Sequence, residues 1–309
     1  MFNKGTSGIA RKRKGNPVHG WVVLDKPYEL GSTSAVGKVR WLFKAQKAGH
    51  AGTLDPLATG ILPIALGEAT KTVPFLVDAI KGYDFTLTFG DNTDTWDAEG
   101  VVTDSSDVRP SKTQIIAALP QFIGDIEQTP PKFSAIKVDG KRAYDLARAG
   151  EEVALKSRHV HVQDVTLSEY TREAATFSVV CGKGTYIRSI ARDLAASLGT
   201  CGHVTMLRRT RVGPFHLEHA FSLDALDQLC HRGGVSEALR PVTTALDDIP
   251  VLAITDQDAI YLKQGRAISP SLSPQLLESE WILAMCETKA IALCIPRDGQ
   301  LWPKRVFNI

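Results

Sequence analysis

A glycine-punctuated segment, residues 50–60, leads into the apolar run Ile61–Leu66. It reads HAGTLDPLATG, and its glycines permit backbone conformations that a side chain forbids, so another backbone or a ligand can come close. Asp55 stands directly before a proline, which favours an extended backbone and holds the carboxylate away from the chain. An Asp-Pro pair in a loop is most often a turn residue. The segment therefore predicts either a tight turn or a site built around Asp55.

The hydrophobic pattern along the rest of the chain predicts strands and helices in no regular alternation. Strands are expected at Gly20–Leu24, Gly82–Gly90, His159–Val165 and Thr176–Val180, and helices after an N-cap at Ser34 and at Lys112–Leu119, Ile187–Leu198 and Asp256–Gln264. Between them, Phe133–Gly140 and Lys141–Gly150 predict a hairpin followed by a helix. This mixture favours an α+β fold over repeated βαβ units.

The composition excludes several protein classes. No run of about 18 apolar residues is present, so we expect no membrane span. Residues 1–15 are polar and basic without an apolar core, which argues against a secretory signal. The 5 cysteines are widely spaced and include no C-x-x-C pair, which is typical of reduced cysteines in a cytoplasmic protein and predicts no metal site.

The distribution of charge is more informative than the net charge of +2. Basic residues gather at Arg11–Lys14, at Arg208, Arg209 and Arg211, and within one stretch at Lys132, Lys137, Lys141, Arg142 and Arg148. Each cluster alone is typical of a solvated face. Three of them in a nearly neutral chain favour a polyanionic partner.

The segment Gly49–Leu62 resembles the signature G-H-x-G-T-L-D-P-x-A-x-G-x-L of the TruB family of tRNA pseudouridine synthases at every fixed position. Further segments resemble this family in the same order: Leu24–Pro27 with Ser32–Ser34, Lys81–Tyr83 with Gly90–Asp97, Gln128–Lys137 running on to Tyr144, and Gly182–Ser189. Residues 28–30 make the gap between Pro27 and Gly31 longer than in the family's pattern. The resemblance covers roughly residues 19–248.

The resemblance implies a fold and a domain organisation. We expect an α+β pseudouridine synthase fold, with a mixed, mainly antiparallel sheet flanked by helices and loops. The expected parts are a basic disordered tail at 1–18, a catalytic domain at 19–248 with an RNA-gripping insertion at about 127–152, and a small β-rich, PUA-like RNA-binding domain at 249–309.

The resemblance also implies a reaction, the isomerisation of uridine 55 in the T loop of tRNA after its base is flipped into the site. Asp55, Tyr83 and Arg188 are expected to be catalytic, with Arg188 as the bidentate counter-charge of Asp55. The residues expected to bind substrate are His50, Tyr186, Lys26, Gly52, Thr53 and Leu207, and those expected to grip the RNA are Lys132, Lys137, Lys141 and Arg142. The reaction needs no redox step and no group donor, so no cofactor is expected.

Two alternatives stay open on the sequence alone. One is an RNA-binding or tRNA-folding protein of the same fold, in which catalysis is secondary. The other is similarity to the guide-RNA-dependent relatives, which lack the insertion that residues 127–152 supply. We therefore expect a monomer that binds the T arm of tRNA without a guide RNA and without a membrane.

Overall fold

The structure is a computed structural model that describes residues 15–134, 136–138, 140–149 and 155–309. Its main sheet has the strand order β1-β3-β12-β4-β11-β10-β7, with β2 beside β3 and β13 beside β12. The strands are β1 (Gly20–Lys26), β2 (Ala48–His50), β3 (Thr59–Leu66), β4 (Lys81–Phe89), β7 (Gly124–Gln128), β10 (Arg158–Tyr170), β11 (Ala174–Cys181), β12 (Gly202–Val212) and β13 (Phe215–His216). The pairing of β3 with β12 is parallel and the other pairings in this sheet are antiparallel, which confirms the mixed, mainly antiparallel sheet.

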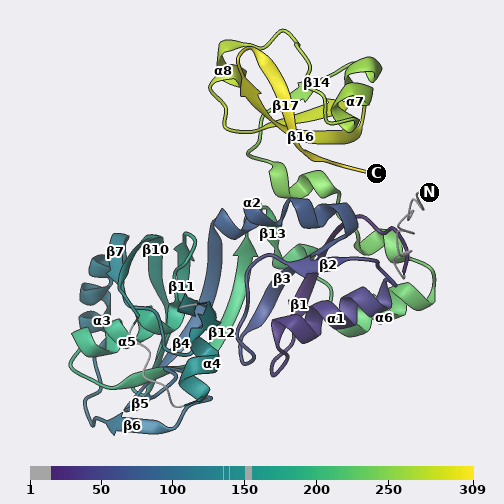
Figure 1. The fold of residues 1–309 in the computed structure, drawn as a ribbon. Helices are drawn as coiled ribbons and strands as arrows, with labels where there is room; N and C mark the ends of the chain where they lie inside the picture. Colours follow the sequence, from purple (N-terminus) through teal and green to yellow (C-terminus); the bar gives the residue numbers. More distant parts are fainter. Residues whose placement is uncertain (1–14, 135, 139, 150–154) are drawn as a thin grey trace, which may run out of the picture.

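Helices cover the two halves of this sheet separately (Figure 1). Helices α1 (Ser32–Leu42) and α6 (Leu223–His231) pack over β1 and β3, whereas α3 (Lys112–Ala118) and α5 (Ile187–Ser197) pack over β4, β10 and β11. Shorter elements connect them: α2 (Val73–Asp78), the hairpin β5 (Asp91–Thr93) and β6 (Val102–Ser105), and the 3-10 turns Gly67–Lys71, Leu119–Phe122, Leu217–His219, Val235–Ala238 and Val242–Leu246. The two apolar clusters therefore meet where β12 joins β3 to β4.

The predicted elements are present, but β10 runs on to Tyr170, five residues past the predicted end, and α1 starts elsewhere than predicted. The helix begins at Ser32 with Gly31 as its N-cap, so the prediction of Ser34 as N-cap was wrong. Ser32 is buried because its hydroxyl bonds to the backbone of Leu54, a contact that local sequence does not show. The capping box of α3, in contrast, is local: Ser111 accepts from the N–H of Gln114, whose side chain accepts in return.

The predicted hairpin and helix after Phe133 are also present. The hairpin consists of β8 (Lys137–Val138) and β9 (Lys141–Arg142), and the helix is α4 (Ala143–Arg148). Residues 135, 139 and 150–154 lie outside the described part of the chain, as do residues 1–14 of the predicted tail at 1–18. The last four residues of that tail are described, and the backbone of Asn16 bonds to the backbone of Lys44 and Gln46.

A second, smaller sheet lies at the C-terminal end of the chain (Figure 1). Its strands are β14 (Val251–Ala253), β15 (Ile282–Cys286), β16 (Lys289–Arg297) and β17 (Gln300–Val306), accompanied by α7 (Asp256–Lys263) and α8 (Pro274–Leu277). Lys71 binds this unit, donating to the carbonyl of Val306 at 2.5 Å and accepting on its own carbonyl from Arg305 at 2.8 Å. No helix in the described ranges is long and apolar enough to cross a membrane.

Candidate active site

The segment between β2 and β3, residues 51–58, carries Asp55, and we call it the Asp55 loop. Two buried side chains hold its backbone next to Asp55. Ser32 donates to the carbonyl of Leu54 at 2.8 Å and accepts from its N–H at 2.9 Å. Lys26 donates from Nζ to the carbonyl of Pro56 at 3.0 Å. The backbone on both sides of Asp55 is therefore fixed by groups outside the loop.

Lys26 supports the loop from the end of β1 and is fully buried. Its ammonium also donates to the carbonyls of Pro27 at 2.9 Å and Leu30 at 2.7 Å. Burial lowers the pKa of Lys26 to about 8, against the opposing effect of the nearby Asp55 carboxylate. These contacts are those of a residue that shapes the loop, whereas the sequence predicted a substrate-binding role.

Arg209 on β12 is a second buried cation behind the loop, with 1% of its surface exposed. Its guanidinium donates to three main-chain carbonyls: Nε to Ile61 at 2.7 Å, Nη2 to Gly52 at 3.1 Å and Nη1 to Thr53 at 3.5 Å. Gly60 lets β12 come this close, because a Cβ there would lie 2.2 Å from the Arg209 carbonyl oxygen. Arg209 therefore positions the Asp55 loop.

The basic cluster at 208–211 does not form one exposed surface, and a polyanion cannot reach its buried member, Arg209. Arg209 points into the interior. Arg208 forms a bidentate ion pair with Asp25, with Nη2 donating to Oδ2 at 2.7 Å and Nη1 to Oδ1 at 3.0 Å. Because neighbouring residues of a strand point to opposite faces, consecutive arginines on β12 cannot share one surface.

Arg188, the second residue of α5, makes the ion pair with Asp55. Its Nη2 lies 2.9 Å from Oδ2 of Asp55, and its Nη1 lies 3.3 Å from Oδ2 of Asp97. The same two nitrogens donate to the carbonyls of Phe133 and Thr95, both at 2.9 Å. The guanidinium thus spans two carboxylates, so the predicted bidentate grip on Asp55 alone was wrong.

Asp97 is a site residue to which the sequence analysis gave no role. Its side chain is 11% exposed, and its Oδ1 accepts from the Thr95 hydroxyl at 2.6 Å and from the Glu99 N–H at 3.0 Å. It ends the segment Gly90–Asp97 on which part of the family resemblance rests. A buried arginine needs an acidic partner, and that requirement was the signal that could have identified it.

Three hollows meet at Asp55, whose side chain is 37% exposed. The first has a volume of about 90 Å³ and is lined by Thr53, Tyr83, Tyr186, Arg188 and Leu207 among others. A second, of about 20 Å³, lies between Ala58, Asp97 and Leu207. The third, of about 230 Å³, opens toward Asp94, Phe133 and Tyr144. Asp55 is therefore accessible from several directions although its backbone is enclosed.

The two tyrosines of the first hollow are held differently. Tyr83 lies on β4 opposite Arg209 of β12, and burial raises the pKa of its phenol, which keeps it neutral. Tyr186 precedes α5, and the buried side chain of Gln128 donates to its carbonyl at 3.2 Å and accepts from its N–H at 2.8 Å. The guanidinium of Arg158 lies 5.2 Å from its ring centroid. Gln128 is a further support that the sequence analysis did not identify.

The remaining predicted residues lie around the loop. His50 ends β2 opposite Ile64 and is not among the described residues that line the three hollows. Gly52 has a φ of +88° and offers its carbonyl to Arg209.

Of the residues predicted to grip RNA, Lys132 is exposed, whereas the side chains of Lys137, Lys141 and Arg142 lie outside what the structure describes. The described residues contain no group of three His, Cys, Asp or Glu side chains that could hold a metal ion.

This arrangement suits chemistry by a positioned carboxylate. A carboxylate is presented by a rigid loop and is oriented by a guanidinium, while apolar and aromatic side chains line the space beside it. Such a carboxylate can act as a nucleophile or as a base toward a group held in the hollow.

Comparison with known proteins agrees with this reading. The family description "TruB family pseudouridylate synthase (N terminal domain)" matches residues 40–187, and "tRNA pseudouridylate synthase B C-terminal domain" matches residues 188–249. The tRNA pseudouridine synthase B of Caulobacter vibrioides is 55% identical over 97% of this chain and 100% of its own. That of Bradyrhizobium diazoefficiens is 50% identical over 97% of this chain and 91% of its own.

A solved structure shows the same fold. The chain is similar to one in a Cbf5-Nop10-Gar1 complex, with a TM-score of 0.70 and 26% sequence identity over 90% of this chain and 78% of that one. The family descriptions cover consecutive parts of the chain and the relatives match nearly its whole length. The chain therefore belongs to the TruB family of pseudouridylate synthases.

Proposed function

We propose that this enzyme converts uridine 55 in the T loop of tRNA to pseudouridine, with Asp55 as the reacting carboxylate. The observation that carries the proposal is the position of Asp55 where three hollows meet, with Arg188 at 2.9 Å. Bacterial relatives named tRNA pseudouridine synthase B, about half identical over nearly the whole chain, support tRNA as the substrate.

The reaction is an isomerisation that conserves all atoms. The bond between N1 and C1′ breaks, the freed uracil turns, and a bond forms between C5 and C1′. The proton on C5 is then lost, and N1 ends up carrying a proton. Asp55 acts on the nucleoside as nucleophile or base, and no electron acceptor or group donor takes part.

The proposed roles of the other residues follow from their positions. The uracil is flipped out of the RNA and held between aromatic and apolar walls, as enzymes that act on a base in structured RNA require. Tyr83, Tyr186 and Leu207 line the hollow beside Asp55 and provide those walls. Arg188 keeps the carboxylate aimed at the base. His50, directly before the Asp55 loop, and Gly52 and Thr53 within it contact the nucleotides around the target.

The enzyme acts as a monomer in the cytoplasm and reaches the T arm without a guide RNA. The insertion, residues 127–152, grips the RNA backbone, and its first residues are anchored at the site through the contact of Gln128 with Tyr186. The C-terminal part, residues 249–309, is a PUA-like domain that adds a further RNA contact.

The proposal is tested with an unmodified tRNA transcript and purified protein. Pseudouridine should appear at position 55 and be located by chemical mapping or mass spectrometry. A transcript with cytidine at position 55 is the matched control and should yield no product. Product at another position alone would contradict the assignment of uridine 55, and no product from either transcript would contradict pseudouridine synthesis itself.

Chelation should leave the activity unchanged. The chemistry needs no metal, so the single-turnover rate in EDTA should stay within about twofold of the untreated rate, with no nucleotide or metal added. The rate is measured as tritium release from 5-tritiated uridine in the transcript. A rate lost in EDTA and restored by zinc would contradict this reading.

The triple variant Lys132→Ala, Lys137→Ala, Lys141→Ala should bind tRNA more weakly. Each cation that neutralises a phosphate contributes about 0.7 to 0.9 to the slope of log affinity against log salt, and the slope should flatten accordingly. Affinity is measured at several salt concentrations for the variant and the unchanged protein. Identical slopes would leave the insertion without its proposed role.

A further inference from the structure

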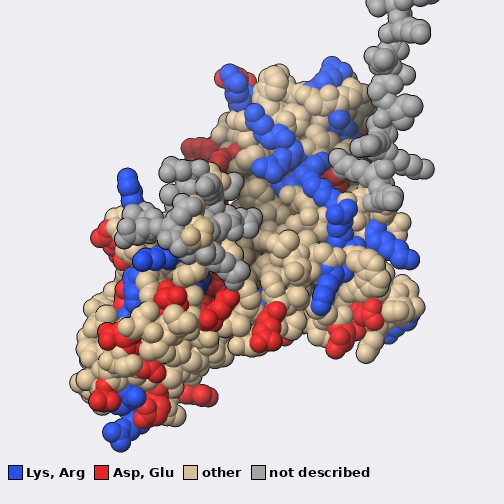
Figure 2. Space-filling view, turned by 60° about the horizontal axis from the view of Figure 1, so that its bottom comes forward, with Lys and Arg blue, Asp and Glu red and all other residues tan. Residues whose placement is uncertain are grey.

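Helix α1 and the turn after it carry basic side chains and no acid. Lys38, Arg40, Lys44 and Lys47 are all exposed, and residues 31–47 contain neither Asp nor Glu. Arg40 is braced by the carbonyls of Ala45 and Gln46 at 3.2 and 3.1 Å. Figure 2 shows Lys and Arg gathered in a band across the middle of the molecule, with Asp and Glu more frequent on the lobe at lower left. A surface of this kind is complementary to a polyanion.

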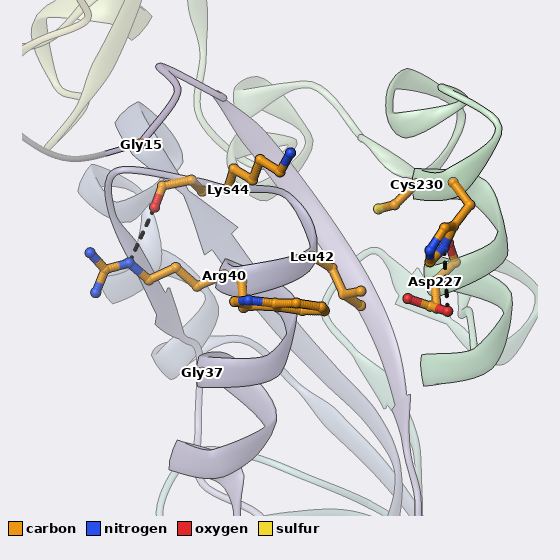
Figure 3. A pocket seen from close by; sticks show the side chains of 10 residues that line it. Gly15, Gly37, Arg40, Leu42, Lys44, Asp227 and Cys230 are labelled. Atoms are coloured by element: carbon orange, nitrogen blue, oxygen red, sulfur yellow. Dashed lines mark hydrogen bonds and ion pairs between the residues drawn. The ribbon is translucent and has the colours of Figure 1, made fainter.

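Trp41 stands within this basic surface and is 75% exposed, the largest exposure among the large hydrophobic side chains of the described residues. Tryptophan is usually largely buried, so an exposed ring on a stable helix needs an explanation. It borders a cavity of about 690 Å³ between α1 and α6, lined also by Arg40, Lys44, Asp227 and His231 (Figure 3). Asp227 lies 3.4 Å from His231, which offsets its charge when the imidazole is protonated.

The position of α1 connects this surface to the active site. The first residue of the helix, Ser32, is bonded to Leu54, the neighbour of Asp55. At a rise of 1.5 Å per residue, Trp41 lies about 14 Å further along the helix axis. An RNA that places a nucleotide at Asp55 therefore has other nucleotides within reach of Trp41.

We propose that the C-terminal end of α1 is a second RNA-binding site, at which an unpaired nucleotide of the tRNA stacks on Trp41. Lys38, Lys44 and Lys47 would meet the phosphates on either side of that nucleotide. Aromatic rings between basic side chains bind single-stranded nucleic acid in this way, because every base has a flat face and every nucleotide a negative charge. The inference rests on the proposed function, since it takes tRNA as the ligand.

The first test compares Trp41→Ala and Trp41→Phe in tRNA binding. Loss of one stacked base should weaken binding at least about fivefold, and Trp41→Phe, which keeps an aromatic face, should recover most of that loss. Ile116→Ala, which removes a 50% exposed side chain on α3, is the matched control and should bind normally. Affinity for tRNA within twofold of the unchanged protein in Trp41→Ala would overturn the proposal, and is the result that a protein occupant of this surface would give.

The second test reads the stacking itself. Tryptophan emission should fall when tRNA binds, and the fall should be smaller in Trp41→Phe, because a stacked base quenches the indole. Equal quenching in the two proteins would overturn the proposal. Product formed by the unchanged protein at uridine 55 is measured in parallel: its absence would contradict the proposed function, whereas normal product with unaffected Trp41 variants would contradict only the second site.

Discussion

Asp55→Asn is expected to form no detectable pseudouridine while it binds tRNA about as tightly as the unchanged protein. The amide has the same shape as the carboxylate, and the backbone of the loop is held by Ser32, Lys26 and Arg209, none of which bonds to the Asp55 side chain. The loop should therefore keep its form and lose only the reacting group. Product is measured in single turnover and binding by filter retention.

The control for this variant is thermal unfolding, which should change little. A variant that retains a tenth of the unchanged rate would contradict the assignment, since that loss corresponds to only about 1.4 kcal/mol of barrier. Parallel loss of tRNA binding would instead show that the substitution had disturbed the loop.

Arg188→Met is expected to reduce the single-turnover rate at least about 100-fold. The methionine cannot bridge Asp55 and Asp97, and a reacting group misplaced by about 1 Å can lose that much. Stability should also fall, by about 3 to 5 kcal/mol, because Asp97 would stay buried without its cation. The rate is measured on a tRNA transcript and stability by chemical denaturation.

Arg172→Met in the exposed turn between β10 and β11 is the matched control, and both its rate and its stability should be unchanged. Arg188→Lys separates charge from geometry: a single ammonium keeps the charge but cannot reach both carboxylates and both carbonyls. If Arg188→Lys is as active as the unchanged protein, the spanning geometry has no role in the reaction.

Local signals were sufficient for much of the architecture. The alternation in Gly82–Gly90 predicted β4, the amphipathic spacing in Ile187–Leu198 predicted α5, and the proline at position 27 predicted the end of β1. The motif around Asp55 identified the loop because glycine and proline restrict the backbone there. Each of these features is determined by residues close together in the sequence.

The supports of the site could not be predicted in the same way, because they join distant parts of the chain. Arg209 reaches the loop from a strand 157 residues away from Gly52, and Gln128 holds Tyr186 across 58 residues. An arginine in a basic run is ordinarily solvated, so the sequence context of Arg209 predicted an exposed side chain where the structure has a buried one. Only the parallel pairing of β3 with β12 brings Arg209 behind the loop.

The hydrogen bonds by which Lys26 and Arg209 hold the Asp55 loop go to main-chain oxygens. Every residue type has the same backbone carbonyl. As long as the backbone conformation is kept, this support does not depend on which side chains the loop carries. Thr53 and Leu57, which face the hollows, can therefore be exchanged without removing a single bond that holds the loop in place. A designer, or natural selection, can change what this loop contacts in an RNA while its aspartate stays where it is.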